Sequence, residues 1–346
     1  MRKARFPAAG FAVACTVLLA LPLTVLGHHS RANFRFDTVV ELEGTITAHD
    51  YRNPHTFLTL ETTNDADEPQ EWLLAANSVP NLRQGGWHAD TFSVGERVTI
   101  CGNPDRDPSR LLLFVDTLTK LDGSVYSSSG IAPGGQTPLT AETVGSTDFS
   151  GVWQPDFSER NIAAGFMAAD LPMTPKGQAF LDAYDMADDP ALDCEAESLP
   201  MTLLPIYPVQ FSRVGDDELN IWYEQFDGRR VVYLGMDEHP ADTARSHMGH
   251  SIGRIDRNVL SIDTAYFTED RWGLGRGAPS GLQKHVVEQY TLTDDGLSLE
   301  VEYTFVDPEY LAEPVTESGS MPLNPGYVME VWDCNRDAAR RHLSVE

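Results

Sequence analysis

Histidines and carboxylates gather at two places in the sequence where they could do chemistry. The first is the run His28-His29-Ser30, which directly follows an apolar leader. Cleavage after Gly27 would leave His28 as the first residue, with its α-amine and ring Nδ1 able to chelate one metal ion. Both groups lose their protons near neutral pH, and imidazole suits Cu(II). The junction therefore predicts a histidine brace for copper.

A brace needs a second histidine elsewhere, and the sequence leaves three candidates open: His29, His49 and His55. His49 and His55 flank one predicted turn between strands, where they can face one another. The alternative for the terminal pair is a polar chain end without a metal. The alternative for His55 is a turn residue bonded to the backbone beside Pro54.

The second gathering lies in the C-terminal half, in and beside predicted strands. We expect its members to meet at one mouth of a β-barrel, where a histidine beside a carboxylate can transfer protons. His247 and His250 are three residues apart, but in a predicted loop, so the spacing is a weak metal signal. Packed or surface histidines are the alternative. The residues are His239, Asp242, His247, His250, Asp263, His285 and Glu288.

Aromatic side chains are frequent in the same half, and Trp222 and Trp272 are candidates for lining a ligand site. Most of the aromatics are expected to fill a core. A barrel of this length can still enclose one small apolar molecule. Binding of such a molecule is the function the sequence favours, and an enzyme that uses the histidines and carboxylates is the alternative.

The compartment follows from the leader. Arg2, Lys3 and Arg5 precede the apolar stretch Phe11–Leu26, and the small residue Gly27 suits a cleavage site. This is the pattern of a signal peptide over residues 1–27, so we expect a periplasmic or secreted protein. No later segment is long and apolar enough to span a bilayer, so no integral membrane segment is expected after cleavage.

The net charge argues against one class of partner, and the cysteines indicate a disulfide and not a zinc site. The chain has 52 acidic against 25 basic residues, a net charge of −27. Such a surface repels phosphate backbones, which argues against nucleic acid as a partner. Export permits a disulfide between Cys194 and Cys334, leaving Cys101 unpaired in a strand. The cysteines lack the spacing of a zinc site.

Composition divides the chain into two β domains, 28–123 and 148–346, joined by a linker at 124–147 that is rich in Ser, Gly, Pro and Thr. In the first domain, three strands, a helix at 78–84 and two more strands follow the order of an OB-fold barrel. The helix has Pro80 near its start and glycines at its end. The expected strands are Val39–His49, Thr56–Glu61, Glu71–Ala75, Arg97–Cys101 and Leu111–Leu118.

Hairpin signals dominate the second domain. Strands are expected on either side of Asp227-Gly228, Arg257-Asn258 and Asp295-Gly296. Thr174 is expected to cap a short helix. Successive hairpins predict an antiparallel up-and-down β-barrel, and Gly151-Val152-Trp153 is similar to the opening of lipocalin-like barrels. The fold class is therefore all-β, with an OB-like barrel followed by a lipocalin-like one.

The N-terminal domain resembles DUF6152, a family of exported bacterial proteins of unknown function. The resemblance implies a periplasmic or secreted β domain and covers about 28–123. The matching residues are His28-His29-Ser30, Phe36-Asp37, Leu42-Glu43-Gly44-Thr45-Ile46, Asn53-Pro54-His55, Trp72, Leu82 to Trp87 and Asp122-Gly123.

The second domain resembles an exported bacterial domain without an assigned function. Relatives often carry a His-Ser or His-Thr pair about ten residues before the Tyr290 position, where this chain has Pro279-Ser280-Gly281 instead. The matching residues are Asp148 to Trp153, His239-Pro240, Met248 to Arg254, Asp263-Thr264, Val287 to Tyr290 and Asp333-Cys334-Asn335.

Overall fold

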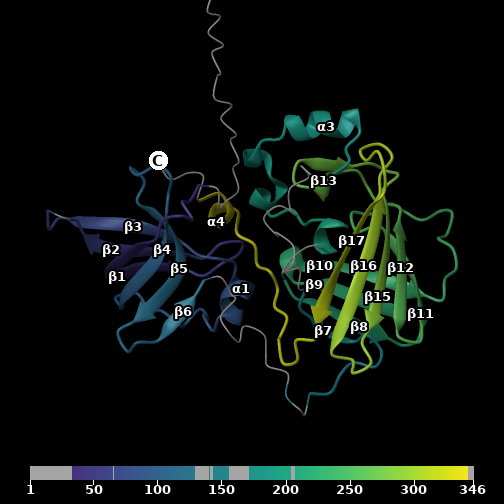
Figure 1. Ribbon diagram of the computed structural model, residues 1–346, viewed down its shortest axis with the longest axis horizontal. Helices are drawn as coiled ribbons and strands as arrows, with labels where there is room; N and C mark the ends of the chain where they lie inside the picture. The colour runs from purple at the N-terminus through teal and green to yellow at the C-terminus, as the bar shows by residue number, and fades with distance from the viewer. Residues whose placement is uncertain are drawn as a thin grey trace, which may run out of the picture.

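The structure is a computed structural model that describes residues 33–341, except 65, 129–139, 141–142, 156–170 and 204–206. The leader and the predicted copper ligands His28 and His29 lie outside the described residues. Two β units stand next to each other, and the C-terminal segment, yellow in Figure 1, runs between them.

The N-terminal unit is a closed five-stranded barrel, as predicted. Its strands are hydrogen-bonded in the order β3-β2-β1-β4-β5, and parallel pairing of β3 with β5 closes the ring. The helix α1 (Val79–Gln84) lies between β3 and β4, has Pro80 in its first turn and ends at Gly85. The strands are β1 (Val40–Asp50), β2 (Phe57–Thr63), β3 (Pro69–Ala75), β4 (Arg97–Pro104) and β5 (Leu112–Lys120).

A sixth strand extends this unit into the range predicted as linker. β6 (Val125–Ser127) pairs antiparallel with β5. The next residue, Ser128, is fully buried, and its Oγ accepts a hydrogen bond from the Asn77 backbone N–H. The N-terminal unit therefore continues past residue 123. Its core contains Ile46, Leu60, Leu74, Leu82, Trp87, Ile100 and Leu118, all fully buried.

The C-terminal unit is a nine-stranded sheet that is nearly closed. The strands at its two edges come together where Trp153 of β7 forms an antiparallel bridge with Leu323. The Gln154 N–H donates to Pro322 O, and the Asn324 N–H donates to Val152 O. The sheet consists of β7 (Gly151–Trp153), β8 (Val209–Val214), β9 (Glu218–Tyr223), β10 (Gly228–Leu234), β11 (His250–Asp256), β12 (Val259–Ala265), β15 (His285–Leu292), β16 (Ser298–Val306) and β17 (Val315–Pro322).

The predicted hairpins are present, but the uniformly antiparallel meander is not. β9 pairs with β10, β11 with β12, and β15 with β16, all antiparallel. β10 and β11, however, run parallel. A parallel connection has to cross back over the sheet, so residues 235–249 form a crossover instead of a tight turn. The sequence signals mark hairpin turns and carry no information about this long return.

Smaller elements cover one end of the barrel. Thr174 caps α3 (Pro175–Asp182) as predicted, because its Oγ1 accepts a hydrogen bond from the Gly177 N–H. β13 (Asp270–Gly275) pairs with β14 (Ala278–Ser280) in a separate two-stranded sheet. None of the helices in the described ranges has the length and apolar character needed to cross a bilayer.

Inward-facing residues of the barrel form one apolar core with an ion pair inside it. Arg230 donates through Nη1 and Nη2 to the two carboxylate oxygens of Glu288, at 2.8 and 2.6 Å, and both side chains are buried. Tyr290 donates to the same carboxylate, and Arg230 Nη1 lies 3.3 Å from the hydroxyls of Ser251 and Thr264. These partners offset much of the desolvation cost of the pair, although the buried Arg230 Nε has no hydrogen-bond partner among the described residues.

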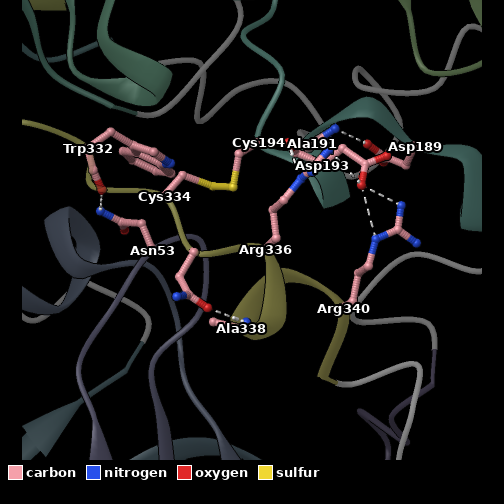
Figure 2. The surroundings of a disulfide bond; sticks show 11 residues. Asn53, Asp189, Ala191, Asp193, Cys194, Trp332, Cys334, Arg336, Ala338 and Arg340 are labelled. Atoms are coloured by element: carbon pink, nitrogen blue, oxygen red, sulfur yellow. Dashed lines mark hydrogen bonds and ion pairs between the residues drawn. A yellow bond between two sulfur atoms is a disulfide. The ribbon is translucent and has the colours of Figure 1, made fainter.

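The predicted disulfide joins Cys194 to Cys334 and holds the C-terminal segment (Figure 2). Beyond Cys334 the short helix α4 (Arg336–Arg340) packs against Asp193, which pairs with Arg336 and Arg340. Cys101 is unpaired, as predicted, and lies half-buried in β4, where burial raises the pKa of its thiol.

The same C-terminal segment docks on the N-terminal barrel. Cys334 forms a parallel bridge with Asn53, whose side-chain amide donates to Trp332 O. Arg341 pairs with Asp50 at 2.6 Å. The disulfide therefore fixes a segment that contacts both barrels.

A buried carboxylate lies where the two units meet. Glu224, from the second barrel, accepts hydrogen bonds from the Tyr327 hydroxyl at 2.7 Å and the Glu330 N–H at 3.0 Å. Arg83 of α1 approaches it at 3.6 Å and also pairs with Glu330 at 3.2 Å. Burial raises the pKa of Glu224 to about 7, so this contact carries a group that titrates near neutrality.

Candidate functional site

Three histidines and one aspartate of the second domain form a continuous hydrogen-bonded array. His239 Nε2 and His285 Nε2 both contact Asp263 Oδ1, at 2.9 and 2.8 Å. His239 Nδ1 lies 2.8 Å from His250 Nδ1. The order along the array is therefore His250, His239, Asp263, His285. The sequence predicted that the three histidines would meet, with Asp263 nearby as a possible carboxylate partner, and the structure brings the four residues together.

The array lies on the outside of the barrel and not in its mouth. Neighbouring residues of a strand point to opposite faces. Thr264 on β12 and Val286 on β15 are fully buried and face inward, so Asp263 and His285 face outward. The crossover between β10 and β11 brings His239 over this outer face. Tertiary topology, and no local pattern, thus assembles the array.

The hydrogen bonds fix the tautomers. An ionised carboxylate only accepts, so His239 and His285 both donate to Asp263 through Nε2. When His239 is neutral, its Nδ1 carries a lone pair and accepts from the Nδ1–H of His250; when His239 is protonated, its Nδ1–H donates to His250 instead. The remaining lone pairs are those of His285 Nδ1 and His250 Nε2, and neither atom has a hydrogen-bond partner among the described residues. The array therefore ends in two potential proton acceptors.

Electrostatics distinguish these two ends. The hydrogen bond that His285 donates to Asp263 raises the pKa of His285, and partial burial opposes this only in part. Burial and the neighbouring His239 lower the pKa of His250, whose ring stacks on Tyr233 at 5.1 Å. Partial burial raises the pKa of Asp263, but the hydrogen bonds from His285 and His239 outweigh it and lower the pKa. His285 is thus the more basic end.

An open pocket of about 630 Å³ adjoins the array. Three members of the array line it, namely His239, Asp263 and His285, together with Arg245 and Tyr266. The His285 side chain is 39% exposed and can reach a bound molecule. Arg245 escaped the sequence analysis, although it belongs to the same crossover as His239, and Tyr266 was expected only as one of the aromatics of the barrel interior.

His247 belongs to a different cluster. Its Nε2 donates to Ala196 O at 2.8 Å, and its Nδ1 lies 3.7 Å from Asp270. Ser198 donates to Asp270 and accepts from the buried Lys284, at 2.6 and 2.9 Å. Burial lowers the pKa of Lys284 to about 8. The expectation that His247 joins the other histidines is therefore wrong.

The other sequence candidates also lie apart from the array. Glu288 faces the barrel interior and holds Arg230. Asp242 is exposed on the crossover. Trp222 is half-buried beneath Arg229, whose guanidinium lies 4.1 Å from its ring centroid, and Trp272 is buried in β13 near Arg276. Neither tryptophan lines the pocket at the array.

Comparison with known proteins bears on the N-terminal domain. Residues 16–113 match DUF6152, a family of unknown function. The first domain is a DUF6152 domain. The match ends within β5 and does not reach the second domain, so the lipocalin-like resemblance of that domain stays a prediction. No curated protein matches the chain.

The described histidines His49 and His55 of the first domain are not joined in one site. His49 packs against Tyr51 and Trp87, and burial lowers the pKa of its ring. His55 lies beside Phe57, with ring centroids 6.5 Å apart. In the described part of the chain, no group of three or more His, Cys, Asp or Glu side chains could hold a metal ion.

Proposed function

We propose that the protein is an exported enzyme whose second domain hydrolyses a small polar molecule by general base catalysis at the outer pocket. The observation that carries the proposal is the Asp263–His285 pair on the wall of an open pocket. An aspartate that accepts from one ring nitrogen orients the imidazole and stabilises its protonated form. The disulfide supports an oxidising compartment, and thus export.

Water is the nucleophile that fits this pocket. No serine, threonine or cysteine is among the described residues that line it. His285 would take a proton from water through Nδ1 while the water oxygen attacks a carbonyl carbon. The bond from this carbon to the leaving oxygen then breaks, and the proton passes from His285 to the leaving group or to solvent. His239, bonded to Asp263 from the other side, helps keep the carboxylate in place.

The predicted effect of Asp263→Asn tests the role of the carboxylate. Loss of the negative charge should lower the pKa of His285 toward about 6.5, because the hydrogen bond that His285 donates to the Asp263 carboxylate is what raises it. With p-nitrophenyl acetate as the probe, we expect the rate to fall about 10-fold or more and its ascending pH limb to move to lower pH. Initial rates measured across a range of pH give the fall in rate and the position of the ascending limb. NMR titration of the His285 ring gives its pKa. An unchanged pH limb would contradict the proposal.

The outer pocket is better supported as the ligand site than the barrel interior, which the sequence favoured for an apolar molecule. Inward side chains pack into one continuous core, and the Arg230–Glu288 pair lies within it. An apolar ligand inside the barrel would have to pack against this charged pair, which is energetically unfavourable.

Copper binding by the N-terminus is a second candidate function. The position of Phe34, near the start of the described chain, supports this candidate. Phe34 packs in one apolar cluster with Phe57, and Phe57 follows His55 by two residues. Phe34, six residues after His28 in the sequence, thus lies at the end of the barrel where His55 is found.

We expect protein beginning at His28 to bind one Cu(II) tightly, and protein with one residue added before His28 to lose that binding. The added residue turns the chelating amine into an amide. Isothermal titration of both forms measures the difference, and equal affinities would exclude the brace.

A further inference from the structure

We infer that the molecule bound in the outer pocket carries a carboxylate and that Arg245 holds this group. The inference rests on the proposed function for the role of His285, but its binding step can be measured without any catalysis. Arg245 lines the same pocket as Asp263 and His285 and is exposed.

Backbone carbonyl groups fix the position of the Arg245 guanidinium. Its Nη1 donates to Leu282 O at 2.7 Å and to Phe267 O at 3.0 Å. A guanidinium has five N–H donors in a planar fork, and these two bonds engage only one of its nitrogens. The other donors have no hydrogen-bond partner among the described residues, so a ligand in the pocket could engage them. A preorganised arginine loses less side-chain entropy when it binds.

No acidic side chain neutralises this charge. Among the described residues, none of the carboxylates lies within 4.0 Å of Arg245, although the pocket is also lined by Asp237 and Glu238. By contrast, buried or half-buried arginines such as Arg230 and Arg83 pair with glutamates. Arg245 thus holds its positive charge on the pocket wall without an ion-pair partner among the described residues, in a chain with a net charge of −27. An anionic ligand would supply the missing partner.

The Tyr266 ring lies between Arg245 and the array and contacts both. The Arg245 guanidinium carbon lies 5.8 Å from the Tyr266 ring centroid, and the His239 ring centroid lies 5.6 Å from the same ring. Leu282, which accepts from Arg245, precedes His285 by three residues. A carboxylate held by Arg245 would thus place the rest of a small molecule beside the array. The planar guanidinium of one arginine can form two parallel hydrogen bonds with the two oxygens of a carboxylate.

Succinate serves as the binding probe. We expect Arg245→Gln to weaken succinate binding at least 10-fold, with Arg254→Gln, an exposed arginine on β11, as the matched control that leaves it unchanged. Isothermal titration gives the affinities, and the shift of the His285 ring resonances on adding succinate reports whether the probe sits in this pocket. Arg245→Lys should recover only part of the affinity, because lysine keeps the charge and loses the fork.

A pair of ester substrates provides the second readout. The ratio of kcat/KM for mono-p-nitrophenyl succinate to that for p-nitrophenyl acetate should fall about 10-fold in Arg245→Gln, mainly through KM of the anionic ester. Equal losses for both esters, or unchanged succinate affinity, would show that Arg245 only clamps the loop and would overturn the inference. If succinate binding depends on Arg245 but ester hydrolysis does not depend on His285, the inference stands and the proposed hydrolysis fails.

Discussion

Replacing His285 by glutamine should reduce the hydrolysis of p-nitrophenyl acetate by at least about 100-fold, because a positioned general base contributes a factor of this order. Glutamine can still donate a hydrogen bond to Asp263, so the hydrogen bond that ties the strand β15 to β12 can persist. It has no basic nitrogen, so it cannot take a proton from water. Initial rates of p-nitrophenolate release under saturating and subsaturating substrate separate a loss in kcat from a loss in KM.

The matched control for this prediction is His88→Gln, which removes an exposed histidine of the DUF6152 domain. Imidazoles on any surface hydrolyse activated esters slowly, and this variant measures that background. The expected result is a rate equal to that of the unchanged protein. If His285→Gln and His88→Gln show the same rate, the pocket does not carry the activity.

Replacing Glu288 by glutamine should lower the free energy of unfolding of the second domain by about 3–5 kcal/mol, because it leaves a buried arginine without its counter-charge. Arg230 is 6% exposed and Glu288 is fully buried. The neutral amide keeps the shape of the carboxylate, so the loss reports charge and hydrogen bonding and not a cavity. Urea denaturation followed by tryptophan fluorescence gives the change.

Two further variants make this second prediction specific. Glu302→Gln on β16 removes an exposed carboxylate and should change stability by less than about 0.5 kcal/mol. The double variant Arg230→Met with Glu288→Leu replaces the pair by apolar groups and should be more stable than Glu288→Gln alone. A loss below about 1 kcal/mol in Glu288→Gln would mean that the buried pair contributes little.

The local elements of both barrels could be predicted because their causes are local. Alternation over β1 places Glu41 and Glu43 outside and Ile46 inside, as its sequence predicts. Pro80 and Gly85 bound α1, and Thr174 begins α3. The Cys194–Cys334 pairing could be predicted because the predicted export permits disulfides and these two cysteines lie toward opposite ends of the second domain.

The candidate site could be predicted only in part. Composition and spacing indicated that His239, His250, His285 and Asp263 belong together. They wrongly added His247, which lies in the same crossover as His239 but whose ring is directed toward Asp270. Arg245 gave no signal, because an arginine in a loop is an ordinary surface residue until a pocket surrounds it, and Tyr266 was counted only among the aromatics of the barrel interior.

The amino-acid sequence by itself determined the strand period, the helix ends, the acidic surface and the all-β class, since each depends on residues close together in the chain or on total composition. Only the tertiary structure decided that β10 and β11 run parallel, and this one pairing carries residues 235–249 across the outer face of the barrel. Contacts between strands far apart in the chain set that pairing. They bring the imidazole of His239 to a carboxylate that lies on another strand, and no local pattern encodes such a meeting.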